Sequence, residues 1–175
     1  MPTSSSRDLS FNVCRVRRPD GSNGFLDVVT LLSPEAFLKH GIAAEAIVGF
    51  CTRLTDEGEK LDPGIFRANK PFVDLLHEVI STNAPAVSEL RAAALRQHTG
   101  WTYILDGRTP TPQGHVPVHD IIGAFEVKNG AVVLDSYWAN HEHLLLSSDG
   151  FFKLPVKSLQ DALIERVIKA ATPNQ

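Results

Sequence analysis

The chain has 175 residues, of which 43% are apolar and 21% are charged, with 17 Lys and Arg against 20 Asp and Glu. This length suits one domain, and the composition excludes global disorder because it can supply a buried core. The formal charge of −3 argues against a broad nucleic-acid-binding face. No apolar run approaches the roughly 20 residues of a membrane helix. We therefore expect one domain over residues 1–175, with no nucleic-acid or membrane partner.

The start of the chain, MPTSSSRDLS, lacks the basic and apolar regions of a secretory signal. It predicts a cytoplasmic protein in which residues 1–10 are flexible. Cys14 and Cys51 are the two cysteines of the chain. Without an export signal we expect free, buried thiols, and a single disulfide between them is the alternative.

Two strands are predicted near the start of the chain, over Phe11–Arg17 and Phe25–Leu32. The second segment is rich in β-branched and apolar residues. The turn residues Pro19-Asp20-Gly21 and Asn23-Gly24 lie between them. This order predicts an antiparallel hairpin.

Residues 34–99 are expected to form a helical half. Ser33-Pro34-Glu35 is a typical helix start, and a second helix is expected from about Ala43 to Leu54. Asn69 precedes the clearest helix, and Asn83 precedes another that ends near Gly100. The clearest helix has one apolar stripe at helical spacing, formed by Phe72, Leu75, Leu76, Val79 and Ile80.

Residues 101–154 predict an antiparallel meander of about five strands. Asn129-Gly130 is a strong hairpin signal between Ile121–Lys128 and Ala131–Trp138. Pairing outward from a two-residue loop matches Val127 with Val132, Phe125 with Leu134, and Gly123 with Ser136. On that register these residues and Trp138 share one mainly apolar face, which is typical of a sheet covered on one side.

Asp149-Gly150 repeats the hairpin signal near the end of the meander, and residues 156–171 predict a closing helix. Its apolar face is formed by Val156, Leu159, Leu163 and Val167. Helices packed on one face of an antiparallel meander predict an α+β fold, a two-layer sandwich.

The motifs of several common enzyme classes are missing from this sequence. It contains no G-x-G-x-x-G, no G-x-x-x-x-G-K-[ST] and no G-x-S-x-G. His141-Glu142-His143 begins like the zinc motif H-E-x-x-H, but Leu145 stands at the fifth position. We therefore expect no strongly marked catalytic chemistry.

Four of the seven histidines gather in the second half of the chain: His115, His119, His141 and His143. On extended segments, even spacing puts each pair on one side, so the imidazoles could converge if the two segments meet. Neutral imidazole is a good ligand for divalent metals such as zinc, which makes a divalent metal the candidate cofactor. Histidines that only cover apolar surface or face solvent are the alternative.

The connection over residues 106–120 contains three prolines and two glycines, and a loop this long in a small domain is often functional. Asp106 and Arg108 stand at its start, where they could pair with each other or bind an anion together. A rigid crossover between strands is the alternative. Trp101 and Trp138 are expected in or beside the core rather than as a stacking surface.

These patterns lead to two hypotheses about function. The first is a module that binds a small molecule or a protein partner, for which the ligand-binding candidates are Asp106, Arg108, His115, His119, His141 and His143. The second is an enzyme, metal-dependent in one version, that uses the four histidines. An apolar patch on the helices or on the free sheet face would indicate a homodimer.

Overall fold

The computed structural model describes residues 9–40, 43–51, 61–109 and 114–172. The chain divides into two compact units, one formed by residues 1–75, 145–151 and 163–175, the other by residues 76–144 and 152–162. Helices are combined with open antiparallel sheets, which confirms the predicted α+β fold. That the two units form one domain stays a prediction, and most of the predicted flexible segment 1–10 lies outside the described residues.

The first unit contains a four-stranded antiparallel sheet of order β1-β2-β3-β4. Strand β1 (Asn12–Arg17) pairs with β2 (Phe25–Thr30), which confirms the first predicted hairpin. Strand β3 (Ile47–Cys51) pairs with β2 and with β4 (Phe66–Ala68). Residues 34–99 are therefore not wholly helical.

The helix expected from Ala43 is wrong, because a single 3₁₀ turn at Ala44–Ala46 leads directly into β3. Strand β3 is a run of apolar residues lying between two neighbouring strands, and four of its five residues are buried. A short run buried on both faces resembles a helix segment in sequence, so periodicity alone does not distinguish the two. The predicted end of this helix, Leu54, lies outside the described residues.

Helix α1 (Pro34–His40) follows β2, and its first turn is capped as predicted, because Ser33 Oγ accepts a hydrogen bond from Ala36 N–H at 3.2 Å. The first unit also contains the short hairpin of β9 (Leu146–Ser147) and β10 (Gly150–Phe151). This hairpin confirms the turn predicted at Asp149-Gly150, but it forms a separate two-stranded sheet instead of continuing the predicted five-strand meander over residues 101–154. The ring of Phe151 stacks on that of Phe11, with centroids 4.1 Å apart.

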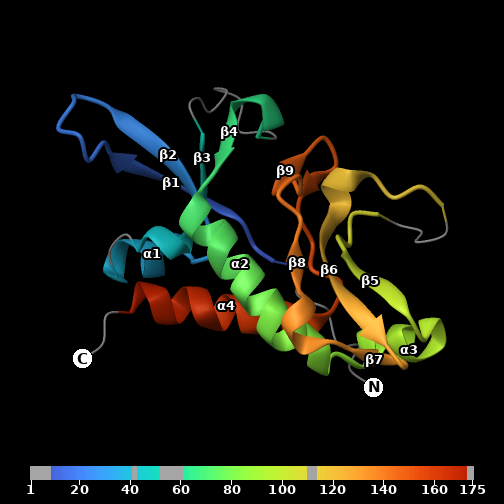
Figure 1. Ribbon diagram of the computed structural model, residues 1–175. Coiled ribbons are helices and arrows are strands. Elements are labelled where there is room, and N and C mark those ends of the chain that lie inside the picture. The colour runs from blue at the N-terminus through green and yellow to red at the C-terminus, as the bar shows by residue number, and fades with distance from the viewer. Residues whose placement is uncertain (1–8, 41–42, 52–60, 110–113, 173–175) are drawn as a thin grey trace, which may run out of the picture. The chain divides into compact units, whose positions relative to one another are not determined.

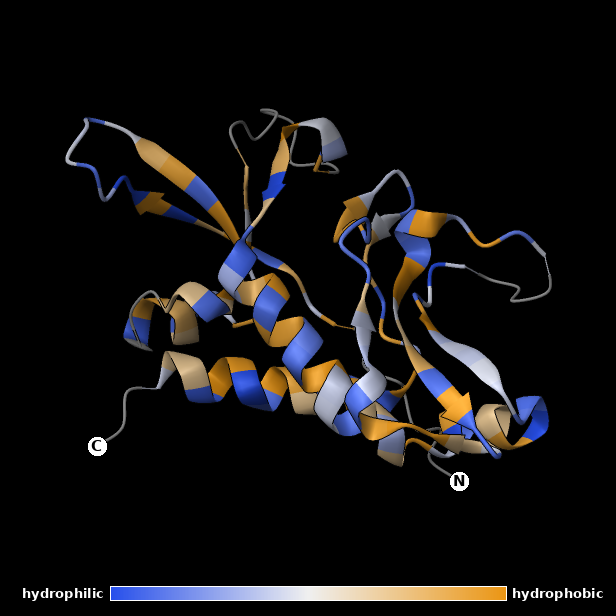
Figure 2. Cartoon of the chain, in the orientation of Figure 1, coloured by the Kyte–Doolittle hydropathy of each residue, from blue (hydrophilic) through white to orange (hydrophobic). Residues whose placement is uncertain are grey.

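Helices α2 (Lys70–Asn83) and α4 (Lys157–Ala171) both run from one unit into the other. Hydrophobic and hydrophilic residues follow one another in bands along them (Figure 2). All five residues of the predicted stripe in α2 are buried, as are Leu159, Leu163 and Val167 in α4. Helical spacing therefore predicted the buried face of α2 and most of that of α4, whereas Val156 lies just before α4 and is only partly buried. None of the helices in the described ranges has the length and hydropathy needed to cross a membrane.

The second unit contains α3 (Ser88–Gln97) and a sheet in which β6 (Ile121–Lys128) is central (Figure 1). Strand β5 (Gly100–Leu105) pairs with one side of β6. The two-residue strands β7 (Ala131–Val132) and β8 (Trp138–Ala139) pair with the other side. All of these pairings are antiparallel.

The turn between β6 and β7 has the predicted form, with positive φ at Asn129 (52°) and Gly130 (76°). Val127 pairs with Val132 as expected. Beyond that pair the predicted register is wrong, because a 3₁₀ turn at Leu134–Ser136 interrupts the strand. Gly123 then pairs with Ala139 instead of Ser136.

The interrupting turn is held by one hydroxyl group. Ser136 Oγ accepts a hydrogen bond from Glu126 N–H at 2.8 Å and donates one to the Val133 carbonyl at 2.6 Å. The turn shifts the pairing by an odd number of residues, and an odd shift moves side chains to the opposite face. Trp138 therefore lies opposite Ala124, not beside Gly123 on the core face.

Candidate functional site

A buried polar cluster lies in the second unit, around the carboxylate of Asp106. Its Oδ2 accepts hydrogen bonds from His143 Nε2 at 2.8 Å and from Arg108 Nη2 at 2.9 Å. Its Oδ1 accepts from the backbone N–H groups of Arg108 and Lys153, both at 3.0 Å. The side chains of Asp106, Arg108 and His143 are almost completely buried. We call Asp106, Arg108, Asp120 and His143 the polar cluster.

Asp120 brings a second carboxylate into the polar cluster. Its Oδ1 lies 3.4 Å from Arg108 Nη2, and its Oδ2 accepts a hydrogen bond from Thr109 Oγ1 at 2.9 Å. Arg108 Nη2 also donates to the Leu144 carbonyl at 2.6 Å. One guanidinium thus lies between two buried carboxylates, so the charges compensate one another inside the unit.

The polar cluster joins four segments that are distant in sequence. Backbone hydrogen bonds run from Asp106 N–H to the Asp120 carbonyl at 2.7 Å and from Gly107 N–H to the Lys153 carbonyl at 2.8 Å. Nearby, Asn140 Nδ2 donates to the carbonyls of Val118 and Ile121 at 2.8 and 2.7 Å. Both ends of the predicted loop 106–120 are therefore fixed, while its residues 110–113 lie outside the described ranges.

The pKa of Asp106 follows from this environment. Burial alone raises the pKa of a carboxyl group, but the hydrogen bonds from His143, from two backbone N–H groups and from Arg108 outweigh burial. The pKa of Asp106 is therefore held below its usual value, and the carboxylate is ionised at neutral pH. All of its acceptor sites are occupied by protein groups, which leaves little capacity for a ligand.

The structure brings together three of the six candidate ligand-binding residues: Asp106, Arg108 and His143. The pairing of Asp106 with Arg108 is confirmed, but the buried guanidinium is turned into the polar cluster rather than toward a dissolved anion. His119 is half-exposed, with Nε2 3.8 Å from Asp120 Oδ1. His115 is exposed, and the His141 ring lies beside that of His77, with centroids 6.5 Å apart.

The four candidate metal ligands, His115, His119, His141 and His143, are thus dispersed. Across the described ranges, no three or more His, Cys, Asp or Glu side chains are grouped so as to hold a metal ion. A zinc-type site needs nitrogen atoms about 2.0–2.1 Å from a common ion. The geometry therefore gives the divalent-metal hypothesis no assembled ligand set.

A second polar contact in this unit holds β8 in register. Tyr137 Oη lies 2.7 Å from His77 Nδ1, and the Tyr137 ring packs on Phe125 with centroids 5.0 Å apart. Burial raises the pKa of the Tyr137 hydroxyl far above its usual value. The hydroxyl therefore stays protonated at neutral pH. Tyr137 points to the core face, so its neighbour Trp138 points to the other face.

The sheet face opposite the core, which we call the outer face, carries exposed aromatic rings. Trp101 is 45% exposed, Tyr103 53% and Trp138 48%. Tyr103 and Trp138 lie directly opposite Ala124 on either side of β6. Because residues paired across an antiparallel ladder share a face, the three rings belong to one surface.

The sequence interpretation missed this surface, since it put both tryptophans in or beside the core. The alternation of exposed Trp101 and Tyr103 with buried Thr102 and Ile104 appears in the folded strand, because Trp-Thr-Tyr-Ile does not alternate polar and apolar residues in sequence. The face on which Trp138 lies could not be predicted from the sequence pattern, because the 3₁₀ turn at Leu134–Ser136 interrupts the strand between β7 and β8. An exposed group of large aromatic side chains commonly marks an interaction surface.

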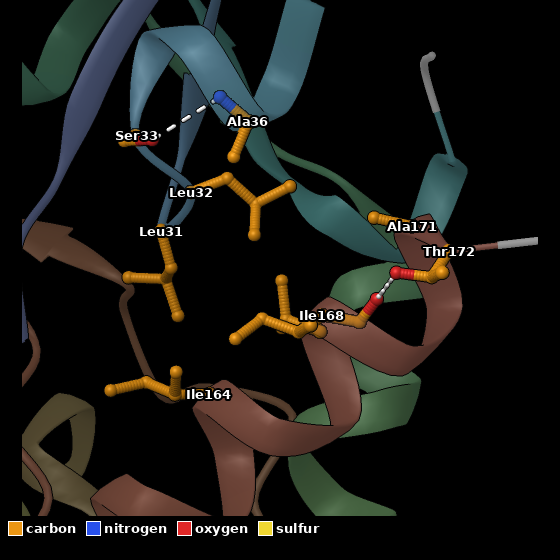
Figure 3. Close-up of a pocket in the computed structure, with 9 residues that line it drawn as sticks. Leu31, Leu32, Ser33, Ala36, Ile164, Ile168, Ala171 and Thr172 are labelled. Carbon is orange, nitrogen blue, oxygen red and sulfur yellow. Dashed lines mark hydrogen bonds between the residues drawn. The ribbon is translucent and has the colours of Figure 1, made fainter. Parts of the chain in front are cut away.

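The first unit contains a small pocket between α1, the segment before it and the end of α4 (Figure 3). Its volume is about 250 Å³. Its walls are mainly aliphatic, with Leu31, Leu32 and Ile168 among them. Its two hydroxyl groups are engaged locally, Ser33 with Ala36 N–H and Thr172 with the Ile168 carbonyl. The pocket lacks the convergent polar groups that orient a small ligand.

Comparisons of the chain with known protein families, curated proteins and solved structures found no match.

Proposed function

We propose that this chain is a binding module that holds a protein partner on the outer face. The observation that carries the proposal is the group of half-exposed rings of Trp101, Tyr103 and Trp138. Tryptophan and tyrosine are the side chains most enriched at the energetic centres of protein interfaces. Their exposure in the free chain costs stability that a partner would recover by covering them.

The exposure of the outer-face rings favours a protein over a small molecule. Ala124, which pairs with Tyr103 on one side and with Trp138 on the other, is only 1% exposed, whereas both rings are about half-exposed. Small-molecule sites are concave, with typical volumes of about 300–1,000 Å³. Exposed aromatic rings paired across one sheet instead suit an apolar surface on another protein.

The charge of the outer face favours a partner without a polyanionic backbone. Its lysine, Lys128, lies 3.1 Å from Glu126 and is neutralised by it. The net charge of the whole chain is also negative. Nucleic-acid stacking surfaces combine aromatic rings with clustered basic residues, and that combination is missing from these strands.

The polar cluster supports binding rather than catalysis. Asp106 and Arg108 bond to one another and to backbone groups, and both side chains are shielded from solvent. A catalytic acid or base must reach a substrate atom within hydrogen-bonding distance. We assign these residues to holding the connections of the second unit in place.

We place this function in the cytoplasm. Cys14 and Cys51 are both free and buried, and burial raises the pKa of each thiol. Unpaired cysteines are typical of proteins in reducing compartments. The raised pKa values reduce the thiolate fraction and hence the reactivity of both residues.

Tryptophan fluorescence provides the test, because both tryptophans of the chain lie on the outer face. The full-length chain serves as bait in its own cell extract, beside a Trp101→Ala/Trp138→Ala double variant and a Leu38→Ala control that removes an exposed leucine from α1. We expect a protein retained by the wild type and the control but not by the double variant. Adding that purified protein to the wild-type chain should shift the tryptophan emission of the chain to shorter wavelength and reduce its quenching by acrylamide.

Two results would contradict the proposal. One is retention of the same proteins by the double variant and the wild type. The other is binding of a purified partner that leaves tryptophan quenching unchanged, because a partner seated on the outer face must shield those rings.

A further inference from the structure

Strand β5 differs from the other sheet edges in the described part of the chain. In the first sheet, edge strand β1 carries Arg15 and Arg17, and edge strand β4 has only three residues, one of them Arg67. Both strands show strongly hydrophilic segments, whereas β5 shows none (Figure 2). Strand β5 is six residues long and has neither a charge nor a proline. Short length, charge and proline are the devices that prevent edge-to-edge pairing, so β5 is the unprotected edge.

The open hydrogen-bonding groups of β5 can be assigned from its neighbour. The N–H of Glu126 bonds to Ser136 Oγ and its carbonyl accepts from Val133 N–H, so both groups point away from β5. Trp101 and Glu126 therefore form a non-hydrogen-bonded pair. The N–H and carbonyl groups of Trp101, and those of Tyr103 two residues on, consequently point away from β6, to an edge on which no strand of the described residues pairs.

We propose that a second copy of this chain pairs with β5, antiparallel, about a twofold axis at Thr102. In this register the Trp101 N–H donates to the Tyr103 carbonyl of the second copy, and the Tyr103 N–H donates to the Trp101 carbonyl of the second copy. The symmetry repeats both bonds, so every open group on the edge from Trp101 to Tyr103 has a partner. The occupant is a second copy because an identical antiparallel strand complements both the open backbone groups and the uncharged side chains of β5 about one twofold axis.

The side chains of β5 are also complementary to themselves in this register. Each Trp101 lies directly opposite Tyr103 of the second copy on the outer face, and aromatic cross-strand pairs stabilise antiparallel sheets. The register brings no like charges together, because β5 is uncharged. The proposed pairing needs only residues Trp101 to Tyr103, where β5 is regular, because the register shift in β5 lies between Ile104 and Leu105.

One bond must be exchanged when the second copy docks. Gln97 Nε2 donates to the Trp101 carbonyl at 2.8 Å in the single chain. This bond is solvent-exposed, and the N–H of Tyr103 from the second copy replaces it. Pairing of this kind joins two outer faces into one continuous aromatic surface. This dimeric pairing through β5 does not depend on which partner the outer face binds.

Sedimentation equilibrium of the full-length chain over a range of concentrations tests the pairing. We expect a monomer–dimer equilibrium in the wild type. Tyr103→Pro removes the outward N–H, at an edge position where proline is tolerated, and should raise the dimer dissociation constant at least ~tenfold. Tyr103→Lys puts a charge at the same position without changing the backbone. It should also raise the dimer dissociation constant at least ~tenfold.

Trp138→Lys is the matched control, because Trp138 shares the outer face but lies on the other side of β6. It should leave the dissociation constant nearly unchanged. Circular dichroism confirms that each variant remains folded. A wild type that stays monomeric overturns the proposal, as does a Trp138→Lys effect equal to that of Tyr103→Lys. A monomer that instead captures an unrelated extended peptide at β5 also overturns it.

Disulfide cross-linking tests the position of the axis. Facing residues in a non-hydrogen-bonded pair have Cα atoms about 4.5 Å apart. A Thr102→Cys chain should therefore cross-link to a second copy under mild oxidation. In the same register the two Tyr103 positions are diagonal neighbours about 7–8 Å apart, so Tyr103→Cys should not cross-link. The wild type, whose two cysteines are buried, serves as the negative control for cross-linking. Cross-linking of Tyr103→Cys but not of Thr102→Cys contradicts the proposed axis.

Discussion

His143 Nε2 lies 2.8 Å from Asp106 Oδ2, and both side chains are almost fully excluded from solvent. The two residues are 37 positions apart in sequence. Their hydrogen bond ties the segment after β8 to the end of β5. The His143 ring also packs edge-on against Phe152, with centroids 6.2 Å apart. This pair therefore stabilises the second unit through both polar and apolar contacts.

Asp106→Asn should destabilise the protein by about 3 kcal/mol. It removes the charge that compensates Arg108, and breaking a buried ion pair from one side leaves an uncompensated charge. Urea unfolding followed by circular dichroism measures the change. Asp135→Asn, at an exposed carboxylate in the same unit, is the control and should stay within about 0.5 kcal/mol of the wild type. Equal stability of the Asp106→Asn variant and the wild type would show that the polar cluster is not what holds these segments.

Acid should destabilise the wild type partly through Asp106. Its folded-state pKa lies below the unfolded value, so its contribution is present above the unfolded value of about 3.9 and is lost as pH falls through the folded value. Urea unfolding at a series of pH values below about 5 measures this loss. The slope of stability against pH should be smaller in Asp106→Asn than in the wild type, and unchanged in Asp135→Asn. Parallel slopes in all three proteins would contradict this assignment.

The parts of the fold that sequence reasoning predicted are those with a local cause. The stripe of α2 follows from helical spacing, and the turn at Asn129-Gly130 follows from two residues that accept positive φ. The pairing of Asp106 with Arg108 needed only their closeness in sequence. In each case the interacting residues lie within a few positions of one another.

The parts that failed depend on contacts distant in sequence. Strand β3 is a strand because β2 and β4 flank it, and nothing within its five residues specifies those neighbours. The face of Trp138 is decided by a turn that Ser136 stabilises through Glu126 on another strand. The role of His143 depends on the carboxylate of Asp106, and the even spacing of His141 and His143 gives no information about that partner.

Alkaline pH should destabilise the protein through Tyr137. The raised pKa of this hydroxyl means that its contribution is fully present below the unfolded value of about 10 and is lost as pH rises toward the folded value. Tyr137→Phe should cost about 1 kcal/mol at neutral pH, because it removes the bond to His77 Nδ1. It should also flatten the decline in stability above about pH 10. Tyr103→Phe, at an exposed ring, is the control. An equally steep alkaline decline in Tyr137→Phe would mean that another group is responsible.

Gly123→Ala should destabilise the second unit by about 1–3 kcal/mol. A Cβ at this position would lie 2.6 Å from Tyr137 Oη and 2.7 Å from the Trp138 carbonyl oxygen. The backbone of β8 must move to admit it, because these distances are shorter than van der Waals contact. The Trp138 ring then shifts on the outer face, so the tryptophan emission should change together with the urea midpoint. Gly24→Ala is the control, since its nearest neighbour is the flexible Arg18 side chain at 3.4 Å. A Gly123→Ala protein with wild-type stability and emission would show that β8 does not pack on β6 as closely as this register requires.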